Sequence, residues 1–250
     1  MDYIVFDLEL NQETTAPKRK PSTGATLPLP FEIIQIGAVR LDSDFNTVAS
    51  FNRLVKPYLY EKINPFVAEL TGITAEQLQR EQPFPEIYRE FSEFAGGDAS
   101  VFCVWGASDM KQLYRSVEFH HLSSCNITRK YINLQPYASM YFHYPAKTQL
   151  RLEYTVRALG IPVEHSFHDA FYDAYYTGEI LKKIHNPFIK AETYDPTGVG
   201  TRPVKSPRRT IDTQGLIEQF EKMYDRAMTR EERDIILLAY KMGKTSQFLK

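Results

Sequence analysis

Hydrophobic positions in the first 57 residues recur with the period of β-strands. Residues 3–10, 31–42 and 48–57 are short runs rich in β-branched and aromatic side chains, and each is expected to form a strand. Only a few polar residues separate the second run from the third, which favours an antiparallel meander. Residues 12–30 contain four prolines and are expected to form a long loop.

Beyond residue 63 the hydrophobic period lengthens toward that of amphipathic helices. Asn64 followed by Pro65 is typical of a helix start, and Thr74 with Gln77 has the spacing of a capping box. Further elements are a helical stripe at Ile87, Phe91 and Phe94, a buried strand at 100–106, and a helix over about 169–185. Strands followed by alternating strands and helices predict an α/β domain with a mixed sheet over residues 1–189.

The composition changes after residue 189. Residues 190–210 are rich in proline, glycine and arginine, which indicates a basic linker or arm. Residues 211–250 contain two amphipathic patterns, one beginning at Asp212 and one at Thr229, so we expect a helical C-terminal extension. Residues 1–189 carry 18 basic and 22 acidic side chains, whereas residues 190–250 carry 12 basic and 9 acidic ones. The C-terminal segment is therefore net basic and the predicted domain net acidic.

The overall composition excludes several classes of protein. Of the 250 residues 43% are hydrophobic and 24% are charged, which rules out global disorder. A formal net charge of -1 rules out a histone-like binder of polyanions. Two cysteines, Cys103 and Cys125, are too few for a disulfide scaffold. Since the chain also has no long apolar run, we expect a soluble cytoplasmic protein that does not bind membranes.

Two acidic residues interrupt the first apolar strand. Asp7 and Glu9 are two residues apart, so their side chains project from the same face of a strand. Buried carboxylates repel each other and are costly to desolvate, so a cation bound between them is one explanation of the pair, although the pair by itself is a weak signal. The alternative is a strand end that faces solvent.

Three further polar residues extend this pattern. Asp109 follows the strand at 100–106, although Ser108 or Asp109 could simply cap the next helix. His168 stands at the start of a late helix and Asp173 lies five residues further on. Asp173 could instead be an exposed helix position. The order is nevertheless specific: Asp-x-Glu on the first strand, Asp after a later strand, and His-x4-Asp on a late helix.

This ordered set resembles the DEDDh branch of the DnaQ/RNase T superfamily of 3′–5′ exonucleases. The stretches EIIQIGAV, NPFVAELTGIT, WGASDMKQL and LGIPVEHSFHDAFYDA strengthen the likeness, which extends over roughly residues 3–185. They are most similar to the histone-mRNA/RNAi-enhancer-type 3′ exonucleases and their bacterial relatives. The resemblance implies an RNase H-like mixed β-sheet flanked by helices.

The resemblance also implies roles for the five polar residues. Two Mg²⁺ or Mn²⁺ ions would bind the carboxylates of Asp7, Glu9, Asp109 and Asp173, since hard divalent ions prefer oxygen ligands. Asp7 would bridge both ions, Glu9 and Asp173 would hold the first, and Asp109 would act on the second. His168 would be the general base that activates water.

Contacts with the substrate are expected from other positions. Phe66, Leu70, Thr71 and Ile73 lie where relatives pack the terminal nucleotide, although core packing would explain each of them equally well. Glu32 could contact the 3′ hydroxyl or form an ordinary strand-end contact. Basic residues at Lys18-Arg19-Lys20 and between Arg202 and Arg209 could bind phosphates or be solvated loops.

The sequence therefore predicts an exonuclease that removes nucleoside 5′-monophosphates from the 3′ ends of single-stranded RNA or DNA, with RNA somewhat favoured. One alternative is a regulatory module on the same fold that binds a protein partner and has no need of catalysis. Another is an oligoribonuclease that acts on very short products. Oligomers could form through the C-terminal helices, whose apolar stripes need burial.

Overall fold

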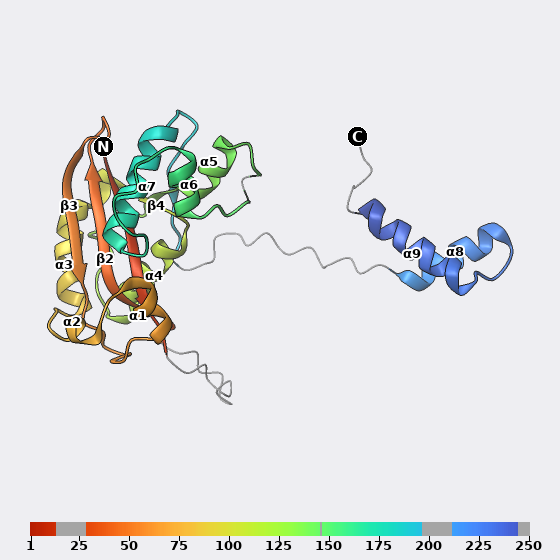
Figure 1. Cartoon of the computed structure of the whole chain (residues 1–250), viewed down its shortest axis with the longest axis horizontal. Coiled ribbons are helices and arrows are strands. Elements are labelled where there is room, and N and C mark those ends of the chain that lie inside the picture. The colour runs from red at the N-terminus through yellow and green to blue at the C-terminus, as the bar shows by residue number, and fades with distance from the viewer. Residues whose placement is uncertain (14–28, 146, 197–211, 245–250) are drawn as a thin grey trace. The chain divides into compact units, whose positions relative to one another are not determined.

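The computed structural model describes residues 1–13, 29–145, 147–196 and 212–244. The chain divides into two compact units, Met1–Gly198 and Val199–Lys250. The first unit contains a sheet with helices on both faces, and the second contains two helices (Figure 1). Among the described residues, no helix has the length and apolar character needed to span a membrane.

The first unit is built on one sheet with the strand order β3-β2-β1-β4-β5-β6. The first three strands are antiparallel and form the predicted meander. Strand β4 pairs in parallel with β1, and β5 pairs in parallel with β4. This mixed sheet confirms the predicted fold class. The strands are β1 (Asp2–Asn11), β2 (Glu32–Leu41), β3 (Thr47–Leu54), β4 (Ser100–Val104), β5 (Lys130–Asn133) and β6 (Glu192–Thr193).

One face of the sheet is covered by helices α3 (Phe84–Ala95) and α4 (Ser108–Phe119). Ile87 and Phe91 of the predicted stripe are buried there, whereas Phe94 is partly buried. Phe91 packs edge-on against Phe6 of β1 with ring centroids 5.8 Å apart. Helix α3 ends at Gly96, whose φ of 72° is the left-handed conformation that glycine adopts at helix C-termini. A 3-10 turn at Gly97–Ala99 then leads into β4.

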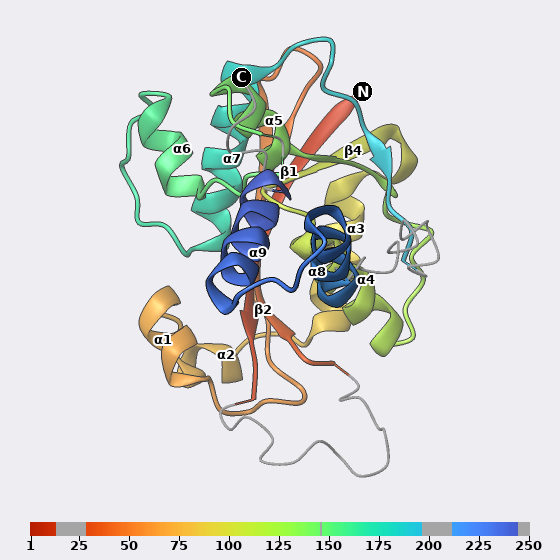
Figure 2. The ribbon, with the colours of Figure 1, turned by 90° about the vertical axis from the view of Figure 1, so that its right-hand side faces the viewer.

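The opposite face is covered by α5 (Leu134–Tyr141), α6 (Leu152–Ala158) and α7 (Ala170–Ile184). Figure 2 shows α7 and α3 on different sides of the sheet. Helix α7 packs closely on β2 because Gly37 has no side chain: a Cβ there would lie 2.1 Å from the main-chain carbon of Ala170. This close approach fixes the N-terminal turn of α7 above the central strands.

Two short helices lie beside the C-terminal end of β1. They are α1 (Pro65–Thr71) and α2 (Ala75–Gln79). Asn64 caps α1 through the N–H of Phe66, and Thr74 and Gln77 form the predicted capping box at α2. The sequence therefore predicted both helix starts correctly.

The sheet extends past the predicted limit of the domain at residue 189. Strand β6 lies inside the segment interpreted as a linker and pairs with β5 at the sheet edge. Tyr194 follows it and packs against Tyr114, with ring centroids 4.9 Å apart. A two-residue strand has no periodicity that a sequence pattern could reveal.

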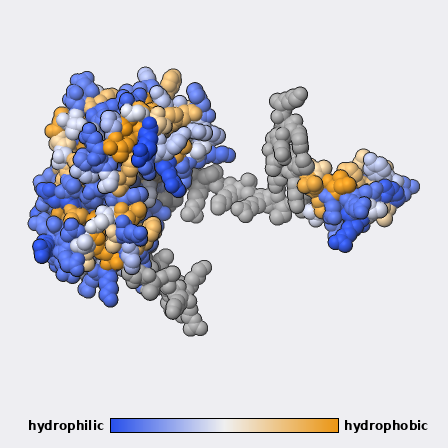
Figure 3. Space-filling view, viewed as in Figure 1, coloured by the Kyte–Doolittle hydropathy of each residue, from blue (hydrophilic) through white to orange (hydrophobic). Residues whose placement is uncertain are grey.

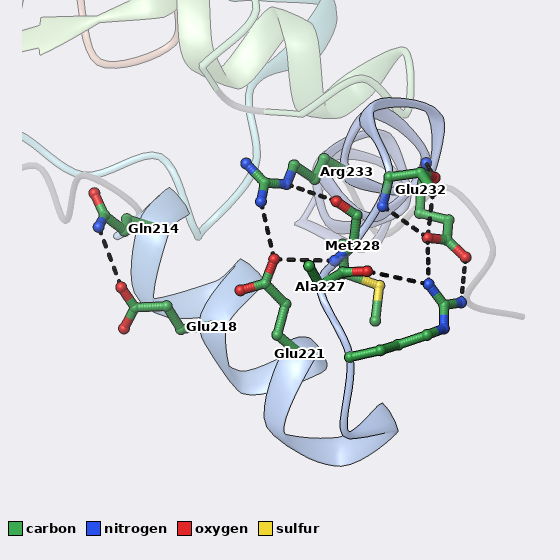
Figure 4. A network of polar contacts seen from close by, with 9 residues as sticks. Gln214, Glu218, Glu221, Ala227, Met228, Glu232 and Arg233 are labelled. Carbon is green, nitrogen blue, oxygen red and sulfur yellow. Dashed lines mark hydrogen bonds and ion pairs between the residues drawn. The ribbon is translucent and has the colours of Figure 1, made fainter.

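The second unit contains α8 (Thr213–Tyr224) and α9 (Arg230–Lys244). Asp212 caps α8, and Thr229 with Glu232 forms the predicted capping box at α9. A polar network joins the two helices: Glu221 accepts hydrogen bonds from the N–H of Met228 and from the Arg233 guanidinium (Figure 4). Ile217 of α8 and Met228, which lies just before α9, are buried.

This helical pair leaves hydrophobic side chains exposed to solvent (Figure 3). Ile235 and Leu238 of α9 are 64% and 58% exposed. The two basic clusters predicted to contact phosphates, Lys18-Arg19-Lys20 and the segment from Arg202 to Arg209, lie outside the described residues.

Candidate active site

The two acidic residues of β1 lie on the sheet face covered by α7. Asp7 pairs with Gly37 and Glu9 pairs with Gln35 on β2, so both carboxylates project from the same face. Glu9 is 9% exposed, which excludes the alternative of a solvent-facing strand end. The strand register shifts directly after Glu9, so regular pairing is interrupted beside the carboxylates.

Asp109 reaches the same region from the first turn of α4. The residue is buried and interacts electrostatically with Asp7 and Asp173. The cap of α4 is Ala107, which makes no side-chain cap hydrogen bond, so the alternative of Ser108 or Asp109 as helix cap is wrong. Helix capping therefore does not explain why Asp109 is buried.

A local helix cap and a hydrogen bond from a distant residue of the sheet together fix the start of α7. Asp169 caps the helix by accepting hydrogen bonds from the N–H groups of Phe171 and Tyr172. The side-chain oxygen of Gln35 accepts the N–H of Ala170 at 3.2 Å, and its amide donates to Asn52 of β3. Because Gln35 is itself buried in β2, it fixes the helix relative to the sheet.

His168 and Asp173 face each other across this helix start. The main-chain N–H of His168 donates to Oδ2 of Asp173 at 3.1 Å. His168 has a φ of 67°, a left-handed conformation that non-glycine residues rarely adopt and that is common at functional sites. Asp173 is 8% exposed, so it is not the exposed helix position considered as an alternative.

These elements bring all five predicted polar residues together. Ligand atoms of Glu9, His168 and Asp173 lie within 4.8 Å of one another. Asp7 interacts electrostatically with Asp109, Asp173 and Glu9. Oδ1 of Asp173 is buried and has no hydrogen-bond partner among the described residues. Such an oxygen needs a proton or a cation.

The cluster strongly disfavours ionisation in the absence of a cation. Burial raises the pKa of Glu9 to about 8, and the charges of neighbouring aspartates add to this effect. Burial likewise raises the pKa of Asp109 and of Asp173 to about 7. The pKa of Asp7 is raised well above its ordinary value, first by burial and then by the three other carboxylates.

A cavity of about 510 Å³ opens onto the cluster from the side of α5 and α6. Asp7, His168 and Asp173 line it, together with Trp105 and Arg151. His168 is exposed to solvent, so its imidazole is accessible from this cavity. A second cavity, of about 460 Å³, lies on the other side of Asp169 toward β3 and the α1–α2 connection.

The residues expected to contact substrate differ in their surroundings. Phe66 and Leu70, one turn apart on α1, are 65% and 40% exposed, so no core packing accounts for them. Ile73 is buried in a small core with Ile34 and Leu78, which is the core-packing alternative. The Thr71 hydroxyl donates to the carbonyl of Val67 at the end of α1.

Glu32 makes the strand-end contact that the sequence left as an alternative. Its buried carboxylate accepts hydrogen bonds from the main-chain N–H groups of Tyr58, Leu59 and Tyr60. Every hydrogen bond that this carboxylate accepts from the described residues comes from this loop. Glu32 therefore orders the segment that follows β3, and a contact with a 3′ hydroxyl stays a prediction.

Sequence reasoning did not identify several residues that shape the site. Gln35, Trp105 and Arg151 were not singled out, although Gln35 is a polar residue inside the apolar run EIIQIGAV. Trp105 donates its indole N–H to the carbonyl of Leu150, which fixes the wall of the larger cavity. Only the folded chain brings these residues to the cluster.

The residues present fit a divalent cation. Burial and mutual repulsion favour the neutral forms of the four converging carboxyl groups, and no Lys or Arg of the described residues lowers the pKa of any of them. Carboxylate oxygens are the ligands that Mg²⁺ and Mn²⁺ prefer, and neither cysteine belongs to the group. A bound cation would lower the pKa of each ligand and satisfy Oδ1 of Asp173.

Comparison with known proteins agrees with this geometry. A family model described as RNase T, exonuclease, matches residues 4–181, so the chain belongs to the RNase T exonuclease family. The prediction of this superfamily from the order of the acidic residues and the histidine is confirmed. The matched region includes β2 to β5, all but the first two residues of β1, and every residue of the cluster, so the family assignment covers the candidate active site.

Individual relatives cover this region to different extents. DNA polymerase III PolC-type of Streptococcus pneumoniae is 27% identical over 179 residues, which span 72% of this chain but only 11% of the relative. The nuclease domain of 3′hExo, a DEDDh family member solved with rAMP, is 19% identical with a TM-score of 0.62, covering 78% of this chain and 96% of that domain. Cell-death related nuclease 4 has a TM-score of 0.60 at 19% identity, covering 77% of this chain and 66% of that nuclease.

Proposed function

We propose that this chain is a two-metal-ion 3′–5′ exonuclease that removes nucleoside 5′-monophosphates from the 3′ ends of single-stranded nucleic acid. The convergence of Asp7, Glu9, Asp109 and Asp173 with His168 at the mouth of a cavity is the observation that carries this proposal. A protein-binding module would gain nothing from burying four carboxylates that repel one another.

Asp7, Glu9 and Asp173 would hold one cation, and Asp109 together with Asp7 would hold the second. When bound, the cations supply charge neutralisation at the phosphate, activation of water and stabilisation of the departing 3′ oxygen. The carboxylates would then be ionised at neutral pH, because cation binding opposes the repulsion that raises their pKa values.

His168 would accept the proton of the attacking water. Its side chain is exposed at the cavity, and its main-chain N–H is held by Asp173, so the imidazole stays beside the carboxylates. Histidine is suited to this step since its ordinary pKa lies close to neutral pH.

The terminal nucleotide would lie against α1. Phe66 and Leu70 present exposed apolar side chains there, at the end of β1 beyond Glu9. Solved relatives support an unpaired 3′ end as substrate: exonuclease I has been solved with a dA16 oligonucleotide, and a 3′-exonuclease recognises the 3′ end of a histone mRNA stem-loop. We propose RNA as the favoured polymer by likeness to the latter group.

The test uses 15-nucleotide RNA and DNA strands that carry a 5′ label, incubated with Mg²⁺, Mn²⁺ or EDTA. The proposal expects a ladder that shortens from the 3′ end, release of 5′-monophosphates, and no degradation in EDTA. A length series from 15 nucleotides to a dinucleotide separates a general exonuclease from an oligoribonuclease. Degradation from the 5′ end, or metal-independent degradation, would contradict the proposal.

We also propose a cytoplasmic location for the protein. Cys103 is buried and Cys125 is exposed, and neither forms a disulfide. Free thiols of this kind persist in reducing compartments.

A further inference from the structure

An exposed aromatic surface lies at the end of α5 and the start of α6. Tyr141, Tyr144 and Tyr154 are 51%, 45% and 47% exposed. Phe142 lies between them: its ring contacts Tyr141 at 5.4 Å and Tyr154 at 6.3 Å between centroids. The side chains of Tyr144 and Tyr154 also interact. We call Tyr141, Phe142, Tyr144 and Tyr154 the aromatic surface.

The charges beside the aromatic surface favour an anionic partner. Residues 140–157 contain Lys147, Arg151 and Arg157 but only one acidic residue, Glu153, although the domain as a whole is acidic. Glu153 is paired with Arg157 at 2.9 Å. Among the described residues no ion pair holds Lys147 or Arg151, so both cations are available to phosphate groups.

The segment directly before Tyr154 lines the active-site cavity. Arg151 and Glu153 line that cavity together with Asp7, His168 and Asp173. Arg151 is the residue directly before α6, and Tyr154 lies on the first turn of this helix, three residues further on. The carbonyl of Leu150 accepts hydrogen bonds from Trp105 and Gln135, which anchors this segment to the cavity wall.

The aromatic surface and α1 lie at opposite ends of the acidic cluster. In both views of the ribbon α1 is at the lower end of the sheet, whereas α5 and α6 are at the upper end (Figures 1 and 2). The larger cavity is lined by Asp7 but not by Glu9, which lies two residues further along β1 toward α1. A strand whose 3′ nucleotide rests on α1 would therefore continue toward α6.

We propose that the aromatic surface and Arg151 bind the nucleotides that precede the scissile bond in a single strand. This inference rests on the exonuclease function proposed above and adds the path of the substrate to it. Bases stack on exposed tyrosines without regard to sequence, and arginine neutralises the phosphates between them. The partner is a single-stranded nucleic acid rather than a protein, because the surface combines stacking rings with unpaired cations and leads directly into the site.

The test compares three proteins: wild type, Tyr144→Leu/Tyr154→Leu, and the control Tyr175→Leu. Tyr175 is a comparably exposed tyrosine on α7 that lies beside Glu164 and Glu179, where phosphates are repelled. Binding of a 5′-labelled 15-nucleotide strand is measured by fluorescence anisotropy with Ca²⁺ in place of Mg²⁺. Cleavage of a dinucleotide and of the 15-nucleotide strand is measured with Mg²⁺.

The double variant should bind the long strand about tenfold or more weakly, the expected effect of losing base stacking on tyrosine. Its kcat/KM ratio of long strand to dinucleotide should fall by a similar factor, while Tyr175→Leu keeps the wild-type ratio. Arg151→Gln should reduce the slope of log affinity against log salt by about one.

Two results would overturn the inference. One is unchanged binding of the long strand by the double variant. This result overturns the inference also if gel filtration shows that the substitutions change the oligomeric state. The other is an equal loss in Tyr175→Leu. If wild type binds the long strand but degrades no nucleic acid, the exonuclease proposal fails while the binding path stands.

Discussion

The main-chain N–H of His168 donates a hydrogen bond to the carboxylate of Asp173, five residues further on in the first turn of α7. His168 has a positive φ at this point, and the bond holds the residue proposed as general base next to a proposed metal ligand. A helix that simply began at residue 168 would direct its N–H along the helix axis. The irregular backbone at His168 therefore lies between the proposed general base and a proposed metal ligand.

Replacement of His168 separates catalysis from this backbone role. His168→Ala should lower kcat by about a hundredfold or more, the usual contribution of a general base. His168→Asn should lose as much activity but retain more stability, because Asn tolerates the left-handed conformation. Mn²⁺ affinity and thermal unfolding check that both variants keep the carboxylate cluster. A pH–rate profile that is unchanged from wild type would exclude His168 as the base.

Asp7→Asn should abolish activity and leave the fold intact. The substitution removes a proposed bridging ligand, but it also removes a charge that repels Glu9, Asp109 and Asp173. The metal-free variant should therefore unfold at a temperature equal to or above that of wild type. Nuclease assays and thermal unfolding in EDTA measure the two effects, and retention of full activity would contradict the assignment.

Gly37→Ala should destabilise the protein and impair catalysis together. The new methyl group would lie 2.1 Å from the backbone of Ala170, so the start of α7 must move away from β2. Overpacking of this kind costs roughly 1–3 kcal/mol of unfolding free energy. Gly178→Ala is the control, since a Cβ there would meet no backbone atom and only the side chains of Val39, Val5 and Leu41, at 3.4, 3.7 and 3.8 Å. Urea denaturation and kcat should change in the first variant and stay near wild type in the second.

Stability of the metal-free protein should fall as the pH rises from about 4 to about 8. The folded state raises the pKa of Asp109 and Asp173 to about 7 and that of Glu9 to about 8, whereas in the unfolded chain these groups ionise near pH 4. In this interval the folded state binds more protons, so each rise in pH favours unfolding. Mg²⁺ should reverse the trend, because it binds the ionised carboxylates. Thermal unfolding at pH 5 and pH 8, with and without Mg²⁺, measures this linkage, and equal Mg²⁺ stabilisation at both values would contradict it.

Removal of the second unit should spare the chemistry but weaken binding of long strands. Truncation after Gly198 keeps the sheet complete, and the removed segment is net basic. Dinucleotide cleavage should persist, whereas the KM for long strands should rise and its salt dependence should decrease. Truncation after Pro187 should in addition destabilise the domain, since it removes β6 and Tyr194. If truncation after Gly198 changes neither KM nor salt slope, the tail plays no part in substrate binding.

The sequence predicted the elements whose signals are local. The strand period of residues 3–10, the Asn64 cap and the Thr74–Gln77 capping box each depend on a few neighbouring residues, and all three occur in the structure. The acidic cluster was also predictable, because carboxylates inside apolar segments are conspicuous and their order along the chain matches a known family.

The features that sequence reasoning missed depend on contacts between distant residues. Gln35 fixes Ala170 from 135 positions away, so no local pattern indicates its role. The same holds for Arg151, which is an ordinary exposed arginine until the fold places it in the wall of the cavity. Glu32 shows the converse: its position in the family pattern favours a substrate contact, whereas its hydrogen bonds order a loop.

The most direct test of the central claim is an anomalous difference map from crystals soaked in Mn²⁺ and a nucleoside 5′-monophosphate. The proposed mechanism predicts two peaks in the cluster, both in contact with Asp7, one shared with Glu9 and Asp173 and the other on the side of Asp109. The phosphate should lie beside them, within reach of His168. Full occupancy of the nucleotide with no peak among these carboxylates would contradict the account.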